Sequence, residues 1–178
     1  MADELQPAGD DAKQAKPIVP ESGVLFGIDY GTKRVGVSVS DRDQKFSSPL
    51  HNYQRQGPQG DKRFFVELVD EYRPVGLVVG LPIHLSGDES EKSREARKFA
   101  EWLNSITGLP YCFQDERFTS FQAERILAAA ELTQKQRKER IDKLAAQILL
   151  QTFLEARHAA RVELQRANED LQTRNAEE

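Results

Sequence analysis

Residues Val24–Asp41, with the sequence V-L-F-G-I-D-Y-G-T-K-R-V-G-V-S-V-S-D, decide the fold that we expect for this chain. They open on a short apolar run that ends at Ile28 and is long enough for a buried strand. Asp29 follows at the exit of that strand, and the tight turn Tyr30–Thr32 comes next. Across Val35–Ser40 valine alternates with glycine or serine, which is the two-residue period of a half-buried antiparallel strand. The stretch therefore predicts a β-hairpin with a carboxylate at the end of its first strand.

The Asp29 carboxylate has two interpretations. An ionised carboxylate that leaves an apolar strand loses hydration unless positive groups meet it. In the simpler interpretation the turn amides, with Lys33 or Arg34, neutralise Asp29, because Asp and Gly are common in turns. In the second interpretation Asp29 binds a divalent cation whose other ligands come from later in the chain. The positions of the other acidic residues bear on this choice.

Composition bounds the class of protein. The 178 residues suit one domain with tails, and 38% hydrophobic with 30% charged residues predicts a modest core under a highly charged surface. The net charge of −4 does not indicate general nucleic-acid binding, so any basic groove must be local. The single cysteine, Cys112, excludes an internal disulfide. Because the chain has neither a membrane-length apolar run nor a signal-peptide core, we expect a cytoplasmic protein with no membrane partner.

The chain divides into three expected regions. Residues 1–23 are polar and predict a disordered N-terminal tail. Residues 24–154 form the expected domain, and residues 155–178 form a charged helical extension that frays. After the hairpin, Phe46–Tyr53 predicts a third strand, and Pro49 within it favours an edge position.

The rest of the expected domain alternates strands and helices. The continuous apolar run Val75–Leu81 predicts a strand buried on both faces, and Leu109–Gln114 predicts the next strand. We expect helices at residues 61–72, 88–107, 119–132 and 141–154, and a basic polar linker at residues 134–140. Antiparallel strands followed by strand–helix alternation predict an α/β fold with a mixed sheet covered by helices on both faces.

Acidic residues fall at the ends of the expected elements. Asp115 and Glu116 follow a strand, as Asp29 does, and Asp142 lies in the first turn of the last expected helix. Ligand sites form beyond the carboxyl ends of parallel strands, so these carboxylates are within reach of one point. Grouped carboxylates repel one another unless cations bind, and oxygen ligands without His or Cys favour Mg²⁺ or Mn²⁺. Taken singly, an ion pair to Glu116 and a helix-dipole role for Asp142 are simpler; only the joint placement favours a metal site.

Four blocks of this sequence, in this order, resemble the signature sequences of the YqgF/RuvX family. They are G-I-D-Y-G-T-K-R-V-G-V-S-V-S-D at residues 27–41, V-V-G-L-P-I-H-L-S-G at 78–87, D-E-R-F-T-S at 115–120 and I-D-K-L-A-A-Q-I-L-L at 141–150. The resemblance covers residues 24–154, and Ser38 stands where the family more often has Ala. It implies a ribonuclease-H-like fold, a divalent-metal nuclease, and a role in maturing the 5′ end of 16S pre-rRNA.

The resemblance also implies the site residues. By position in the blocks, the catalytic and metal-binding acids are Asp29, Glu116 and Asp142, with Asp115 as the second choice for the middle acid. The bound cation is then Mg²⁺ or Mn²⁺. The implied nucleic-acid-binding residues are Lys33, Arg34, Arg117 and Thr119. The implied partners are structured RNA such as pre-rRNA or branched DNA, with ribosomal particles as further partners and a monomer or homodimer as the assembly.

Other functions stay open at this point. One alternative is an endonuclease that resolves four-way DNA junctions, and another is a non-catalytic RNA-binding or ribosome-assembly module. G-I-D-Y-G-T also resembles the first phosphate loop of the actin, sugar-kinase and heat-shock ATPases. That enzyme class encloses ATP between two domains, which a chain of this length does not provide, and the sequence has no second Asp-Gly-Gly loop.

Overall fold

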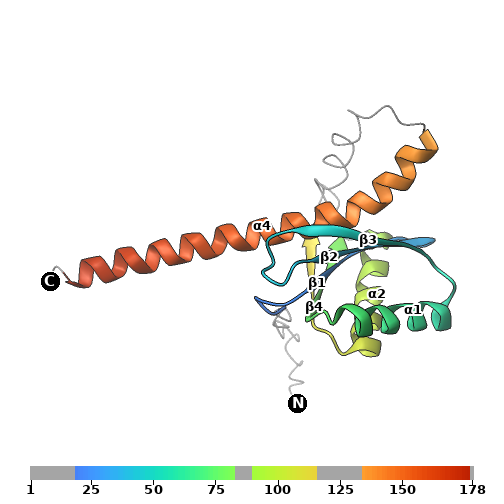
Figure 1. Cartoon of the computed structure of the whole chain (residues 1–178), viewed down its shortest axis with the longest axis horizontal. Coiled ribbons are helices and arrows are strands. Elements are labelled where there is room, and N and C mark those ends of the chain that lie inside the picture. The colour runs from blue at the N-terminus through green and yellow to red at the C-terminus, as the bar shows by residue number, and fades with distance from the viewer. Residues whose placement is uncertain (1–18, 83–89, 116–133, 177–178) are drawn as a thin grey trace, which may run out of the picture.

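The structure is a computed structural model that describes residues 19–82, 90–115 and 134–176; within the last range it describes the side chains of residues 144–170 and 172. Five strands form one sheet in the order β3-β2-β1-β4-β5 (Figure 1). The strands are β1 (Leu25–Tyr30), β2 (Arg34–Ser40), β3 (Ser47–Gln54), β4 (Gly76–Leu81) and β5 (Tyr111–Asp115). β1 pairs antiparallel with β2 and parallel with β4, and β5 extends the parallel half. The predicted α/β mixed sheet is confirmed.

The β1–β2 hairpin forms where the alternating sequence predicts it. Tyr30 pairs with Val35 at the closed end of the hairpin. A Cβ atom on Gly31 would lie 2.5 Å from the Arg34 carbonyl oxygen, so the turn has room only for glycine at this position. The backbone N–H of Arg55 donates to the Lys33 carbonyl at 3.0 Å and ties the turn to the end of β3.

β3 lies at the edge of the sheet, as Pro49 predicts. A proline has no N–H for the sheet, and an edge strand needs backbone partners on one side only. The pairing register of β3 with β2 shifts between Val37 and Ser38, where Val37 faces His51 and Ser38 faces Pro49. The strand therefore accommodates its proline with an irregularity and continues to Gln54.

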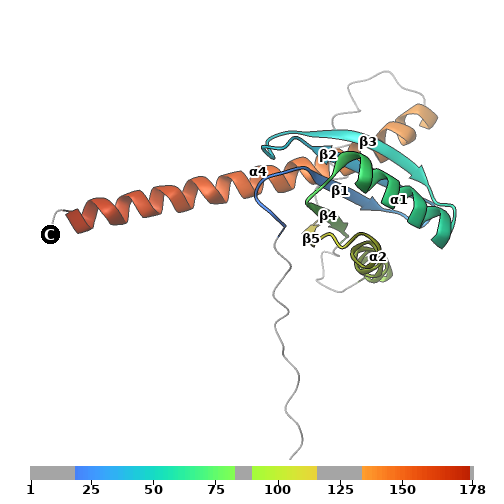
Figure 2. The ribbon, with the colours of Figure 1, turned by 60° about the horizontal axis from the view of Figure 1, so that its bottom comes forward.

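Two helices cover one face of the sheet: α1 (Pro58–Tyr72) and α2 (Glu91–Thr107), which lie side by side in Figure 2. The core on this face is apolar and aromatic, and its fully buried members include Phe26, Ile28, Val35, Val37, Phe65, Val79 and Leu103. The rings of Phe65, Phe99 and Trp102 contact one another in edge-on and tilted geometries. This side of the sheet is a closed hydrophobic core.

One long helix, α4 (Gln134–Ala176), covers the other face. Its contacts with the sheet are close because the strands carry small residues here. A Cβ atom on Gly27 would lie 2.7 Å from the Leu150 Cβ atom and 3.0 Å from the Ala146 carbonyl oxygen. Ser38 donates its hydroxyl hydrogen to the same Ala146 oxygen at 2.7 Å. The apolar part of this face consists of Val19, Leu25, Val78, Leu149, Leu150 and Leu154.

Several expected boundaries differ from the structure. Residues 134–140 begin α4 instead of forming a linker, because Gln, Lys, Arg and Glu all favour helices even without an apolar face. Asp142 therefore lies in the interior of a helix and not in its first turn. The N-cap of α2 is Ser90, whose hydroxyl accepts from the Ser93 N–H at 3.0 Å, and the helix starts at Glu91 rather than near residue 88. The helix expected at residues 119–132 lies outside the described residues.

The described part of the N-terminal segment packs against α4. Val19 is only 2% exposed, although the sequence assigns it to the tail. The Arg157 guanidinium donates to the Val19 carbonyl at 2.7 Å, to the Pro20 carbonyl at 2.9 Å and to Gln44 Oε1 at 3.1 Å. Residues assigned to the N-terminal tail and to the C-terminal extension therefore contact each other, and Arg157 of the extension also contacts Gln44 of the expected domain. None of the helices in the described part of the chain is both long and apolar enough to cross a membrane.

Candidate active site at the carboxyl edge of the sheet

The three parallel strands end at one edge of the sheet, which is where the sequence places its acidic residues. Ile28 pairs with Val79, and Val79 pairs with Phe113, so β1, β4 and β5 are in register. Asp29 comes one residue after this row, and Asp115 comes two residues after it. Neighbouring strands lie about 4.8 Å apart, so the backbones at Asp29 and Asp115 are roughly 10 Å apart. Asp29 and Asp115 therefore lie at the same edge of the sheet, as the sequence predicts.

The two aspartates nevertheless belong to opposite faces. Gly27 faces α4, so Asp29, two residues further along β1, shares that face. In β5 the side chains of Tyr111 and Phe113 pack in the core under α1 and α2, whereas Cys112 packs with the α4 core. Asp115 follows the parity of Tyr111 and Phe113 and lies on the face away from Asp29. This placement argues against Asp115 as a metal ligand that acts together with Asp29.

α4 crosses the sheet so that its earlier turns lie over the carboxyl edge. Arg157 bonds to Val19 near the start of β1 and β4, whereas Ala146 lies over Gly27 further along β1. Moving one turn back from Ala146 to Asp142 advances about 6 Å along the helix axis. Moving from Gly27 to Asp29 advances about 6.6 Å along β1 in the same direction. The backbone at position 142 is therefore carried toward Asp29.

Asn52 is a polar residue on this face that the sequence did not reveal. Asp29 pairs with Gly36 across the hairpin, and Gly36 pairs with Asn52 on β3, so the three residues form one row on the α4 face. The Asn52 Oδ1 atom is buried and has no hydrogen-bond partner among the described residues. A buried oxygen atom without a donor, in the same row as a carboxylate two strands away, suits a hard cation or its bound water. Asn52 can be identified as a candidate site residue only from the pairing of β3 with β2, which no sequence pattern reveals.

The structure describes only some of the other predicted site residues. Lys33 is exposed in the hairpin turn, and Arg34 starts β2 on the same face as Gly36. Glu116, Arg117 and Thr119 lie outside the described residues, as does the side chain of Asp142. Within the described part of the chain no three His, Cys, Asp or Glu side chains gather as a metal site would require. The structure therefore describes the side chain of only one of the three predicted acids.

A buried ion pair supports the edge of the sheet from the α1 side. Asp61, which is fully buried at the start of α1, accepts from Arg55 Nε at 2.9 Å, from the Tyr53 hydroxyl at 3.0 Å and from the Gln56 N–H at 2.9 Å. Burial by itself raises the pKa of Asp61, but these donors outweigh it and hold the pKa below its ordinary value. Arg55 also donates to the Tyr30 hydroxyl at 3.3 Å. The network thereby fixes the last residue of β1, next to Asp29.

The fold and site define a class of protein. A mixed sheet in the order β3-β2-β1-β4-β5, with an acid at the end of its central strand and a long helix crossing that end, is a ribonuclease-H-like fold. The family model described as "RuvX: Holliday junction resolvase" matches residues 23–156. The chain belongs to this family.

Two curated relatives and one solved structure illustrate the similarity. Relatives from Rhodopirellula baltica and Lactococcus lactis subsp. cremoris (strain MG1363), each named "Putative pre-16S rRNA nuclease", are 46% and 39% identical to this chain. The alignments cover 77% and 78% of this chain and 79% and 97% of the relatives. T. thermophilus RuvC in complex with a Holliday junction substrate superposes with a TM-score of 0.48 at 19% identity, over 77% of this chain and 96% of that one.

Proposed function

We propose that this chain is a metal-dependent nuclease that hydrolyses RNA phosphodiesters during maturation of the 5′ end of 16S pre-rRNA. Membership of the RuvX family and the names of the two relatives support this function. The structural observation that carries it is the position of Asp29, at the carboxyl end of the central strand and on the face that α4 crosses. A cytoplasmic location of the protein is part of the same proposal.

The proposed metal ligands are Asp29, Glu116 and Asp142. Asp115 faces the α1 and α2 core, so Glu116, which is next in sequence, is the better partner for Asp29. The helix-dipole explanation of Asp142 is weakened because that effect falls off within the first turn, and α4 begins at Gln134. The three carboxylates would supply oxygen ligands, and the buried Asn52 oxygen lies in the same row as Asp29; oxygen ligands favour Mg²⁺ or Mn²⁺.

The chain's own residues would position the substrate. Lys33 and Arg34 at the hairpin turn, with Arg117 and Thr119 after β5, would bind the backbone phosphates on either side of the scissile bond. Such contacts position a nucleic acid without reading its bases, and in a chain whose net charge is −4 they would form a local basic surface. A bound divalent cation would supply activation of water and stabilisation of the departing oxygen. The carboxylates would hold that cation at the edge of the sheet.

The test compares Asp29→Asn with Asp43→Asn on a pre-16S rRNA 5′ leader in Mg²⁺, Mn²⁺ or EDTA. Asp43 is an exposed residue in the loop between β2 and β3, so its substitution makes the same chemical change away from the site. We expect Asp29→Asn to lower the cleavage rate by about a hundredfold or more with an unchanged melting temperature, because it removes the ligand charge and keeps the shape. Asp43→Asn should cleave like the wild type. Wild-type cleavage by Asp29→Asn would overturn the proposal.

A second candidate function is cleavage of four-way DNA junctions, which the description of the matching family model favours. The same variants should be assayed on a four-way DNA junction under the same conditions. Faster cleavage of RNA than of the junction supports the first function, and the reverse result supports the second. Binding of the RNA or of ribosomal particles without metal-dependent cleavage of either substrate would identify a non-catalytic assembly module instead.

A further inference from the structure

Two basic side chains at the start of α1 lie near the candidate active site and have no role in the function proposed above. Lys62 and Arg63 are exposed in the second turn of this helix. The four sequence blocks that resemble the YqgF/RuvX family include neither of them. Their surroundings indicate what they bind.

Hydrogen bonds hold the start of α1 close to the turn of the β1–β2 hairpin. The Arg55 N–H donates to the Lys33 carbonyl in that turn at 3.0 Å. The Arg55 side chain donates from Nε to Asp61, the residue before Lys62, at 2.9 Å. Lys33 and Lys62 therefore lie at the same end of the sheet, which is the carboxyl edge of β1, and Arg55 connects their two segments.

Arg63 acts electrostatically on the same end of the sheet. Burial and the hydrogen bond to Asp61 raise the pKa of Tyr53, and the positive charge of Arg63 acts in the opposite direction. Tyr53 is the residue before the end of β3 at Gln54. Because charge interactions fade with distance in salt solution, this effect places Arg63 near the end of β3.

The chain segments that form this end contain no exposed acidic side chain. Residues 30–40 contain no acid, and Asp61 is the only acid in residues 44–66. Asp61 is fully buried and pairs with Arg55, so its charge is already compensated. Among the residues that the structure describes, Lys33, Lys62 and Arg63 take part in no ion pair. We call these three residues the basic edge.

Basic side chains elsewhere in the described chain have acidic neighbours. Lys45, at the opposite end of the sheet, lies 3.6 Å from Asp43, and the basic residues of α2 alternate with Glu91, Glu95 and Glu101. The basic edge is thus a local excess of positive charge on a chain whose net charge is −4. Uncompensated cations repel one another, and a polyanion that binds across them relieves the repulsion.

We propose that the basic edge binds the sugar–phosphate backbone of the RNA strand at phosphates beyond those next to the scissile bond. This inference rests on the proposed nuclease function. Asp29 lies on the α4 face of the sheet and α1 covers the other face, so a strand bound at both places passes over the β1–β2 turn, where Lys33 lies. Ammonium and guanidinium groups bind backbone charge without reading bases, and continuity with the candidate site favours the substrate strand as the partner.

The first test measures the dissociation constant of the full-length chain for a fluorescent, single-stranded pre-16S rRNA 5′ leader, in EDTA and at several KCl concentrations. The double variant Lys62→Gln, Arg63→Gln removes two charges from the basic edge. We expect its dissociation constant to be about tenfold higher or more. The slope of log affinity against log salt should become shallower by about 1.4, because each phosphate contact to a single strand contributes about 0.7.

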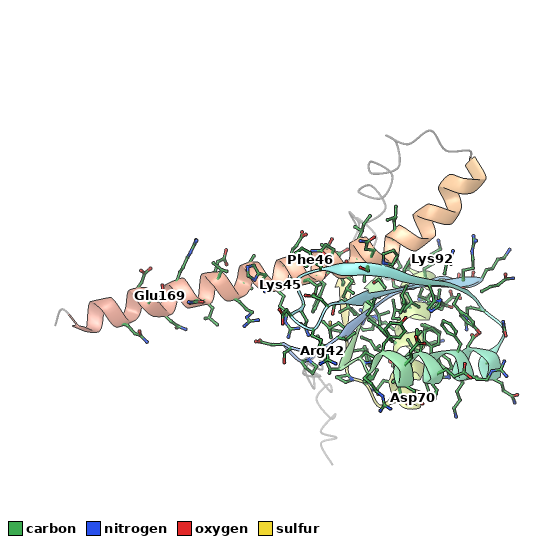
Figure 3. All side chains as sticks on the ribbon, viewed as in Figure 1. Arg42, Lys45, Phe46, Asp70, Lys92 and Glu169 are labelled. Atoms are coloured by element: carbon green, nitrogen blue, oxygen red, sulfur yellow. The ribbon has the colours of Figure 1, made fainter. Side chains whose placement is uncertain are left out.

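The matched control is the double variant Arg42→Gln, Lys45→Gln, which removes the same charge from the other end of the sheet. Both residues are exposed, and in Figure 3 they lie where α4 continues outward from the sheet. We expect the control to keep the wild-type dissociation constant within about twofold and both double variants to keep the wild-type melting temperature. Equal loss of affinity in the two double variants would assign the effect to net charge and overturn the proposal. Wild-type affinity of the Lys62→Gln, Arg63→Gln variant would overturn it too.

The second test locates the contacted phosphates. A short RNA that spans only a few nucleotides on each side of the mature 5′ end should bind the wild type and the Lys62→Gln, Arg63→Gln variant equally. Lengthening this RNA should strengthen binding to the wild type and leave binding to the variant almost unchanged. If the variant lost the same factor on both lengths, the contact would be at the scissile bond and the proposal would be wrong.

Cleavage in Mg²⁺ separates this inference from the proposed function. The Lys62→Gln, Arg63→Gln variant should raise KM by about the same factor as the dissociation constant, with a much smaller change in kcat. If RNA is not cut but the difference in affinity between the two double variants persists, the nuclease proposal fails and the basic edge stands. If RNA is cut and the two double variants bind alike, the basic edge alone fails. Loss of affinity confined to a four-way DNA junction would overturn the assignment to RNA.

Discussion

The two faces of the sheet are built from different side chains, although the same strands supply both. Toward α1 and α2 the strands present Phe26, Ile28, Val35 and Val37, and these pack with Phe65 in a core of large residues. Toward α4 the intervening positions include Gly27, Asp29, Gly36, Ser38 and Ser40. The first face is closed by two helices, and the second is crossed by one helix at close range.

This difference suggests that the α1–α2 face provides most of the stability and that the α4 face carries the candidate site. Large apolar side chains on the α1–α2 face remove the most surface from water and account for most of the hydrophobic stabilisation. Small residues on the α4 face let the helix backbone approach, as the bond from Ser38 to the Ala146 carbonyl shows. The same lack of bulk leaves room for Asp29 and Asn52 at the end of the face. Substitutions on the two faces should therefore have different signatures.

The largest expected effect on stability comes from the apolar face. Phe65→Ala should lower the free energy of unfolding by about 3–5 kcal/mol, because Phe65 is fully buried among the rings of Tyr53, Phe99 and Trp102. Chemical denaturation measures this change. Phe46→Ala makes the same substitution at a phenylalanine that is 71% exposed and should change the free energy by less than about 0.5 kcal/mol. Equal losses for the two variants would show that burial of the Phe65 ring under α1 and α2 does not carry the stabilisation assigned to this face.

A smaller loss of stability with a larger loss of activity is expected under α4. Gly27→Ala places a methyl group against Leu150 and Ala146, so it should cost up to about 3 kcal/mol and move α4 away from Asp29. Gly76→Ala crowds Val19 and Leu25 at the other end of the same face and serves as the control. At a temperature where both variants are folded, only Gly27→Ala should cleave RNA slowly. Similar rates for both would show that the position of α4 does not set the activity.

The smallest expected effect concerns the ion pair at the rim of the apolar face. Asp61→Asn should cost about 1–2 kcal/mol at neutral pH, because Arg55 Nε loses its acceptor. The lowered pKa of Asp61 means that this stabilisation is fully present above the unfolded-state pKa of about 3.9 and is lost as the pH falls through the folded-state pKa. The gap in unfolding free energy between wild type and variant should therefore shrink on acidification below about pH 4.

Asp70→Asn is the matched control for that prediction. Asp70 lies on the same helix as Asp61, and its side chain is exposed. The substitution should leave the unfolding free energy within about 0.5 kcal/mol of the wild type across the same pH range. A gap for Asp61→Asn that does not change with pH would show that the ion pair contributes through packing alone.

Much of the fold could be predicted from particular residues. The alternation of Val35, Val37 and Val39 with small residues predicts β2, and Pro49 predicts the edge position of β3. The boundaries of α4 could not be predicted in the same way. Residues 134–140 carry no apolar stripe, and their helix depends on propensity and on continuity with the turns that follow.

The sequence by itself determined the order of the described strands and helices and the placement of an acid at the exit of β1, because alternation and periodicity are properties of neighbouring residues. Only the tertiary structure decided that Asp29 shares a face with Asn52 while Asp115 does not. It also decided which turn of α4 lies over which residue of β1. Ala146 and Gly27 are far apart in the chain, and their contact depends on how closely the helix packs on the sheet.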